Sequence, residues 1–259
     1  MASNPPSHCC TYGCKHEGEP VGSMSKISGG INAYLAAPAA GQEKKFGTAL
    51  LYIPDIMGIW HNAKLLADQY AAHGYLCLVP DIFLGDPVPI NRPTDFDVKK
   101  WIMKGSDGSS PHTPEIVDAV VKEAILYLNS QHGVVKLGAI GICLGAKYVA
   151  RHFSSGIAVG FIAHPAFMEE VELENITGPL SIAAAEDDDI FTISKRHKSE
   201  EILFNKTPKF PYQLCLYSGT THGFAVRCDL SIQEQRYAKE QAFLQAINWF
   251  DEYLLGYLG

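Results

Sequence analysis

The sequence lacks any run of apolar residues that approaches the roughly 18 needed to cross a membrane as a helix. Its first ten residues, MASNPPSHCC, contain Pro5, Pro6 and His8 where a secretion signal needs an uninterrupted apolar stretch. An excess of positive charge is also lacking, because the formal net charge is −7, which repels nucleic-acid phosphates and anionic membranes. We therefore expect a cytoplasmic protein, monomeric or homodimeric, whose partner is a small molecule and not a nucleic acid or a membrane.

A disulfide framework is lacking as well. The chain has seven cysteines, an odd number for its length, and we expect them to be thiols in a reducing compartment. Cys9, Cys10 and Cys14 lie close together near the N-terminus, but they lack the paired C-x-x-C spacing of a zinc site. We expect no metal and no organic cofactor, and the pattern leaves the role of these three cysteines open.

The remaining composition is that of one large globular domain. With 259 residues, of which 47% are hydrophobic and 19% charged, the chain can bury a substantial core, and no internal repeat divides it. Residues 1–22, rich in Cys, Pro and Gly and without periodicity, are predicted to form an N-terminal extension. Residues 23–259 are predicted to form a single α/β domain.

Short apolar runs alternate with helical patterns along this domain. The runs suit strands buried on both faces of a parallel sheet: Ala49–Ile53, Leu76–Val79, Val135–Ile140, Ala158–Ala163, Leu180–Ala184 and Gln213–Tyr217. The intervening segments predict helices: Asn62–His73, Pro114–Ser130, Ala146–Phe153, Phe191–Asn205 and Ile232–Leu255. Such alternation predicts βαβ units in a doubly wound, mostly parallel sheet with helices on both faces, and Gly85–Ser110 is expected to be a surface excursion near the site.

A possible nucleophile lies between a predicted strand and a predicted helix, in Gly141-Ile-Cys-Leu-Gly145. A G-x-C-x-G sequence in this place predicts a sharp elbow that presents Cys143 at a helix N-terminus, where the helix dipole favours the reactive thiolate. Free cysteines are more often small buried hydrophobes, but glycines on both sides favour the nucleophile.

A thiolate nucleophile needs a base and a carboxylate that orients the base. His222 follows the last predicted strand, where the histidine arrives in the order nucleophile, acid, histidine. Asp187, Asp188 and Asp189 follow the strand Leu180–Ala184, and their positions alone do not choose between them.

A developing oxyanion also needs donors. The expected ones are the backbone amides of Leu144, next to the nucleophile, and of Ile56, in the loop after Ala49–Ile53.

These residues resemble the dienelactone hydrolase family, in the elbow GICLG, the acidic loop AEDDDIF and the segment THGFAVR. The resemblance spans residues from about 25 to the C-terminus and implies an α/β-hydrolase fold with a Cys-Asp-His triad, in which the acid is Asp188. Family members rest with a glutamate beside the cysteine, and the matching residue here is the shorter Asp55. Arg227 resembles an arginine that holds the substrate carboxylate in prototype members.

Prototype members hold the substrate carboxylate with a second arginine as well, and no residue of this sequence matches it convincingly. The substrate therefore need not be a dienelactone. Trp60 and Phe224 are further candidates for gating the site or binding substrate. The leading hypothesis is a carboxylic ester hydrolase that opens a lactone or small ester through an acyl enzyme and needs no cofactor. The alternatives are a non-hydrolytic pathway enzyme on the same fold, and a noncatalytic ligand-binding or redox-sensing protein that needs only the thiol of Cys143.

Overall fold

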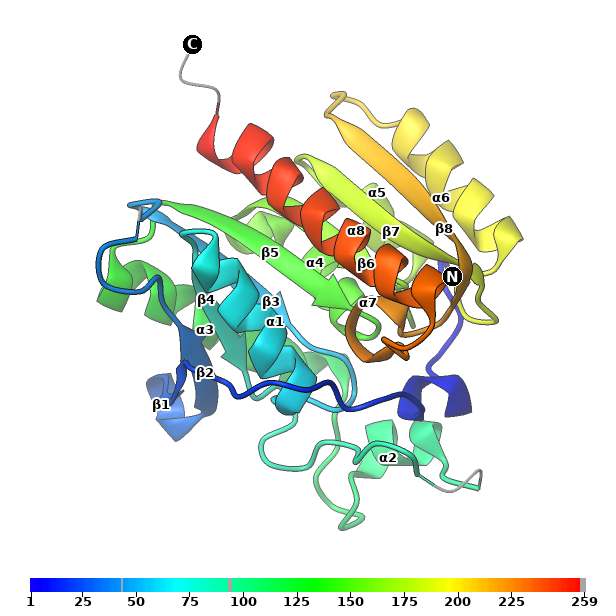
Figure 1. Ribbon diagram of the computed structural model, residues 1–259. Helices are drawn as coiled ribbons and strands as arrows, with labels where there is room; N and C mark the ends of the chain where they lie inside the picture. Colours follow the sequence, from blue (N-terminus) through cyan, green and yellow to red (C-terminus); the bar gives the residue numbers. More distant parts are fainter. Residues whose placement is uncertain (43, 93–94, 257–259) are drawn as a thin grey trace.

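A computed structural model of the chain describes residues 1–42, 44–92 and 95–256. Its centre is an eight-stranded sheet in the order β1-β2-β4-β3-β5-β6-β7-β8, in which the pairs from β4 to β8 are parallel and β2 runs antiparallel to both neighbours (Figure 1). The strands are β1 Ser23–Lys26, β2 Asn32–Ala36, β3 Thr48–Ile53, β4 Leu76–Pro80, β5 Lys136–Ile142, β6 Ile157–Ala163, β7 Leu180–Asp187 and β8 Tyr212–Thr221. The predicted doubly wound, mostly parallel sheet is confirmed.

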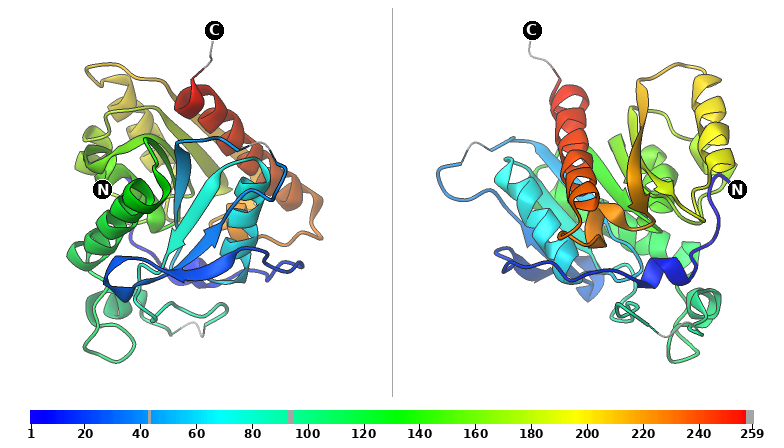
Figure 2. Two further views of the ribbon diagram at one scale, coloured as in Figure 1. Left: turned by 90° about the vertical axis from the view of Figure 1, so that its left-hand side faces the viewer. Right: turned by 45° about the vertical axis from the view of Figure 1, so that its right-hand side comes forward.

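Helices cover both faces of the sheet. They are α1 His61–Ala72, α2 Val98–Lys104, α3 Pro114–His132, α4 Gly145–Arg151, α5 Glu170–Glu174, α6 Ile193–Phe204, α7 Phe224–Arg227 and α8 Gln233–Phe250, with short helical turns η1 His8–Thr11, η2 Ser28–Gly30, η3 Phe153–Ser155 and η4 Asp251–Leu255. Helices α1 and α8 cover one face and α3 and α4 the other, and β8 lies between α8 and α6 (Figure 2). Among the described residues no helix combines the length and apolar character that crossing a membrane requires.

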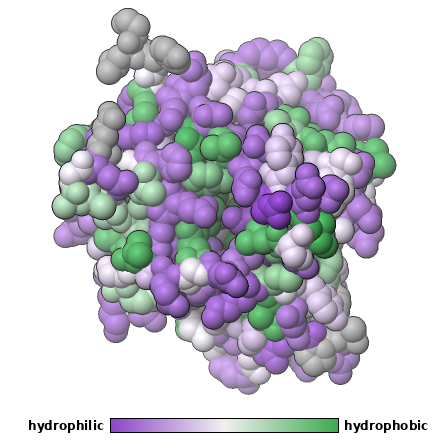
Figure 3. Space-filling model, viewed as in Figure 1, coloured by the Kyte–Doolittle hydropathy of each residue, from purple (hydrophilic) through white to green (hydrophobic). Residues whose placement is uncertain are grey.

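Helix α3 shows how the sequence sets an element that covers the sheet. Pro114 occupies its first turn, and Gly133 ends it in a left-handed conformation (φ 61°) that favours glycine. Its buried residues recur at three-to-four spacing and pack towards the sheet: Val117, Val120, Val121, Ala124, Ile125 and Leu128. The opposite side of the helix is exposed, and the face of the molecule seen in Figure 3 is mostly hydrophilic with scattered apolar patches.

Several elements were not predicted. Strands β1 and β2 are short and lie at one edge of the sheet; SMSK of β1 is largely exposed, and NAYLA of β2 is only five residues long although mostly buried. The excursion 85–110 contains α2, whose Trp101 is buried, and the amide of Val88 donates to the carbonyl of Ile56 at 2.8 Å. This segment therefore packs against the loop after β3, on the side of the sheet where the candidate site lies.

The N-terminal residues pack closely against the rest of the chain. Ala2, Ser3 and Cys10 are fully buried, and the amide of Ser3 donates to the carbonyl of Met168 at 3.0 Å. In Figure 1 this segment starts beside α6, forms η1 and then passes below α1 towards β1. The predicted extension thus covers the carboxyl ends of the central strands.

Candidate active site

The elbow after β5 holds Cys143 in a strained conformation. Its φ is +54°, a region that costs a non-glycine residue about 1–3 kcal/mol. A Cβ on Gly145 would lie 2.0 Å from the carbonyl oxygen of Ile53, and one on Gly141 would lie 2.6 Å from the Cα of Ala146. Both glycines are therefore required for the turn to pass so close to its neighbours.

Three side chains meet at the carboxyl ends of three strands. The Sγ of Cys143, after β5, lies 3.1 Å from Nε2 of His222, which directly follows β8. The other ring nitrogen of His222, Nδ1, lies 2.9 Å and 3.1 Å from the two carboxylate oxygens of Asp188, after β7. All three residues are buried, so the structure brings together the predicted Cys-His-Asp set.

The structure also separates the three aspartates between which the chain order does not choose. Asp188 is buried, and its Oδ1 accepts hydrogen bonds from the amides of Ile190 (2.8 Å) and Phe191 (3.0 Å). Asp187 and Asp189 are exposed. Burial raises the pKa of Asp188, but His222 and the two amides outweigh burial and lower it, so the carboxylate stays ionised beside the imidazole.

The electrostatics of the site favour a thiolate and an imidazolium. Burial alone would raise the pKa of the Cys143 thiol, but the adjacent Cys10 thiol and the charge of His222 bring it well below its ordinary range. Burial alone would lower the pKa of His222, but the Cys143 thiolate and Asp188 raise it to about 10. The resting proton therefore lies on the imidazole, from which it can pass to a leaving group.

Cys10 is a part of the site that the sequence analysis did not assign. Its Sγ lies 3.5 Å from the Sγ of Cys143 and 3.5 Å from Nε2 of His222, although it precedes both by well over a hundred residues. Within the described ranges, these three residues form a His/Cys/Asp/Glu group compact enough to hold a metal ion, with ligand atoms within 4.8 Å of one another. An ion there would occupy the candidate nucleophile and base.

His164 also was not predicted. It follows β6 with φ 36°, is fully buried, and its ring centroid lies 4.8 Å from that of His222. Burial lowers its pKa to about 4, so this imidazole is neutral at pH 7. A single histidine after a strand forms no recognisable pattern, and only the tertiary structure places it beside the elbow.

Asp55 and Arg227 form a buried ion pair. The Nη1 of Arg227 lies 2.5 Å from Oδ2 of Asp55, and Oδ1 of Asp55 accepts a hydrogen bond from the amide of Met57 at 3.1 Å. Burial raises the pKa of Asp55 to about 6 despite the guanidinium. The two residues expected to gate the thiol and to hold a substrate carboxylate are thus turned towards each other, and neither role is tested by this arrangement.

The predicted oxyanion donors lie in two loops that pack together. Leu144 and Ile56 are both buried, and Gly145 of the elbow lies against the carbonyls of Ile53 and Pro54, at the start of the loop that carries Ile56. This contact brings the two backbone segments to the same end of the sheet. The donor role of both amides stays a prediction.

A cavity of about 410 Å³ lies between the N-terminal segment and the loop that carries His222. Phe224 and Arg227 line it together with Cys9 and Tyr12. Trp60 is half-buried just before α1 and is not among the described residues that line this cavity. Cys143 is fully buried, and the Sγ of Cys10, from the N-terminal segment, lies 3.5 Å from its sulfur.

The chain is similar in sequence and in fold to proteins of one known family. The model of the dienelactone hydrolase family matches residues 31–254. The chain is 44% identical to hydrolase tropI of Talaromyces stipitatus, over 98% of this chain and 99% of the relative, and 35% identical to dienlactone hydrolase 1 of Gibberella moniliformis, over 98% and 96%. A solved dienelactone hydrolase-like promiscuous phosphotriesterase from metagenomic libraries superposes with a TM-score of 0.68 at 13% identity, covering 90% of this chain and 98% of that one, which shows the shared α/β-hydrolase fold.

Proposed function

Because the chain belongs to the dienelactone hydrolase family and is a hydrolase, we propose that it cleaves a lactone or a small carboxylic ester through an acyl enzyme on Cys143. The observation that carries this proposal is the line of contacts from Cys143 through His222 to Asp188. A protein that only sensed oxidants would need the thiol and no oriented base. The complete set therefore favours hydrolysis over the noncatalytic alternative.

In the proposed reaction, the Cys143 thiolate attacks the acyl carbon, and the amides of Leu144 and Ile56 stabilise the resulting oxyanion. The imidazolium of His222 gives its proton to the departing alkoxide, which in a lactone remains attached to the acyl chain. The now neutral imidazole takes a proton from water, which attacks the thioester and releases the acid. Asp188 keeps Nδ1 protonated, so that Nε2 faces the reacting atoms throughout.

The proposed substrate carries no essential carboxylate. The charge of Arg227 is balanced by Asp55, and both side chains are about 1% exposed, so the guanidinium is engaged before any substrate arrives. A neutral lactone or ester leaves this pair intact, whereas a carboxylate would have to displace Asp55. We also propose a reducing, cytoplasmic location, which fits seven cysteines that are all free thiols.

Steady-state kinetics on a panel of neutral and carboxylate-bearing lactones and aryl esters tests this proposal. We expect neutral members to have the higher kcat/KM, and Cys143→Ala to lower it by about 10⁴-fold or more, because members of a triad act as a unit. Cys215→Ser, on the edge strand β8, is the matched thiol control. Turnover of Cys143→Ala within a few-fold of the unaltered protein would overturn the proposal.

A further inference from the structure

The N-terminal segment places a second thiol directly against the candidate nucleophile. Cys10 lies in η1, and its Sγ is 3.5 Å from the Sγ of Cys143. A disulfide needs about 2.05 Å between sulfurs, so the two atoms must approach by roughly 1.5 Å, a distance that small side-chain rotations cover. Both residues are fully buried, which keeps the thiols of other proteins away from the pair.

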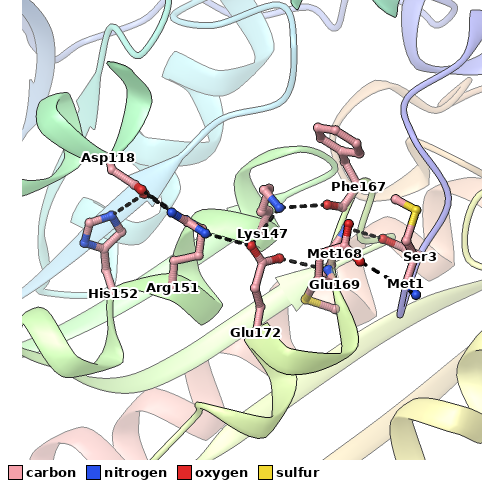
Figure 4. A network of polar contacts seen from close by, with 10 residues as sticks. All are labelled: Met1, Ser3, Asp118, Lys147, Arg151, His152, Phe167, Met168, Glu169 and Glu172. Atoms are coloured by element: carbon pink, nitrogen blue, oxygen red, sulfur yellow. Dashed lines mark hydrogen bonds and ion pairs between the residues drawn. The ribbon is translucent and has the colours of Figure 1, made fainter. Parts of the chain in front are cut away.

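Contacts on both sides of Cys10 hold it there. Before it, the N-terminal amine lies 3.7 Å from a carboxylate oxygen of Glu169, and Ser3 exchanges hydrogen bonds with Met168 (Figure 4). After it, the carbonyl of Tyr12 accepts a hydrogen bond from Nε of Arg227 at 2.7 Å. The position of Cys10 is therefore fixed by contacts on both sides and does not depend on a flexible tail.

The two thiols differ in the way that stepwise oxidation requires. Burial and the neighbouring Cys143 raise the pKa of Cys10 well above its ordinary range, so this thiol stays protonated. The pKa of Cys143 is lowered, chiefly by the Cys10 thiol and His222 against the effect of burial, so this sulfur is the thiolate. Oxidants attack the thiolate first, and an adjacent thiol can then resolve the product.

We propose that Cys10 and Cys143 form a reversible disulfide when the protein meets a peroxide. The thiolate of Cys143 attacks one peroxide oxygen, the O–O bond breaks, and the departing oxygen takes the proton of the His222 imidazolium to leave as water or an alcohol. The sulfur of Cys10 then attacks the sulfenic sulfur of Cys143, the S–O bond breaks, and the hydroxide leaves as water with the Cys10 proton. Two thiols and one peroxide thus give a disulfide, an alcohol or water, and one further water.

Through this disulfide, the N-terminal segment would protect the thiol of Cys143 from further oxidation. While Cys143 is in the disulfide, it cannot attack an ester, and it cannot proceed to the irreversible sulfinic acid. Reduction by a small thiol restores both groups. The activity consequence rests on the proposed function, but formation of the disulfide does not.

Non-reducing peptide mass spectrometry after treatment with a several-fold molar excess of hydrogen peroxide tests the proposal, because each sulfinic acid consumes two peroxide molecules. Trypsin releases Cys143 in the peptide 137–147 and places Cys9, Cys10 and Cys14 together in the peptide 1–15, so single serine variants identify the partner. We expect the two peptides to be linked in the unaltered protein, in Cys9→Ser and in Cys14→Ser. In Cys10→Ser we expect no link and sulfinic acid on Cys143.

The reversal is measured on the same samples by adding dithiothreitol and counting iodoacetamide-reactive Cys143. At least a tenfold smaller recovery is expected in Cys10→Ser than in Cys9→Ser, because sulfinic acid is not reduced by thiols. Sulfinic acid on Cys143 without a link in the unaltered protein, or a link that persists in Cys10→Ser, would overturn the proposal. Because both readouts are masses, failure of the proposed hydrolysis would leave them unchanged.

Discussion

The choice of Asp188 as the triad acid leads to a prediction whose size follows from the structure. In Asp188→Asn, the side-chain oxygen can still accept from the amides of Ile190 and Phe191, which bond to Oδ1 now. The new amide nitrogen then faces Nδ1 of His222, where Oδ2 lies at 2.9 Å. A donor in that place favours the tautomer with the proton on Nε2, which cannot accept a proton from the thiol or from water.

The charge of Asp188 adds to this effect. His222 has a pKa of about 10 where an ordinary histidine has 6.5, a difference on the order of 5 kcal/mol that Cys143 and Asp188 share against the effect of burial. A hydrogen bond to a charged group contributes about 1.5–3 kcal/mol, so the loss of the Asp188 carboxylate is expected to weaken the thiolate–imidazolium pair by on the order of 2 kcal/mol, or about 30-fold. With the wrong tautomer, we expect a loss of about 10²- to 10⁴-fold in kcat/KM.

The assay is kcat/KM for the best neutral ester, measured on variants that circular dichroism and thermal unfolding show to be folded. Asp187→Asn and Asp189→Asn are the matched controls, because each removes one exposed negative charge next to Asp188 in the chain. We expect each control to retain activity within about tenfold, as befits charges screened by solvent. A loss in either control equal to that of Asp188→Asn would refute the assignment of the acid.

Four further predictions concern the thiol and the buried ion pairs. Iodoacetamide alkylation of Cys143 should keep most of its rate between pH 8 and pH 6, because the neighbouring imidazolium keeps the pKa of the thiol low, and a tenfold fall per pH unit would contradict this. Asp55→Asn should lower the free energy of unfolding in urea by about 3–5 kcal/mol, because the guanidinium of Arg227 stays charged and buried. Arg227→Met should lower the free energy of unfolding by less, and its loss of stability should shrink as the pH falls. Burial already raises the pKa of Asp55 to about 6, so without the guanidinium this carboxyl binds a proton more readily in the folded protein than in the unfolded chain. An equal loss at all pH values would argue against this explanation. Glu172→Gln should lower the stability of the protein more than Lys147→Met. The first change leaves the buried ammonium of Lys147 without the carboxylate that lies 2.7 Å from it, whereas the second leaves Glu172 paired with Arg151 (Figure 4). Thermal unfolding that ranks the two variants the other way would contradict this prediction.

Much of the fold was predictable because its central strands and large helices are buried on a regular period. The runs predicted at Val135–Ile140 and Leu180–Ala184 correspond to β5 and β7 within a few residues, and the elbow follows β5 as expected. Edge strands and short helices carry weaker signals: β1 is largely exposed, and α7 is four residues long. Such exposed or very short elements leave no hydrophobic period in the sequence that would predict them.

The site was predictable where chain order and local chemistry determine it. Cys143 and His222 follow strands whose carboxyl ends must share one edge of the sheet. The choice of Asp188 from the residues alone was open, because only burial separates it from its neighbours. Cys10 and His164 were missed because their approach to the elbow depends on packing between distant segments, which leaves no local pattern.

The central claim, that Cys143 forms an acyl enzyme, is tested most directly by rapid quenching of a reaction with an activated aryl acetate, followed by mass spectrometry. Covalent acetyl on the tryptic peptide 137–147 at Cys143, absent from Cys143→Ala and longer-lived in His222→Ala, is the predicted result. Sustained turnover with no acyl group on Cys143, or with the acyl group on another residue, would contradict the account.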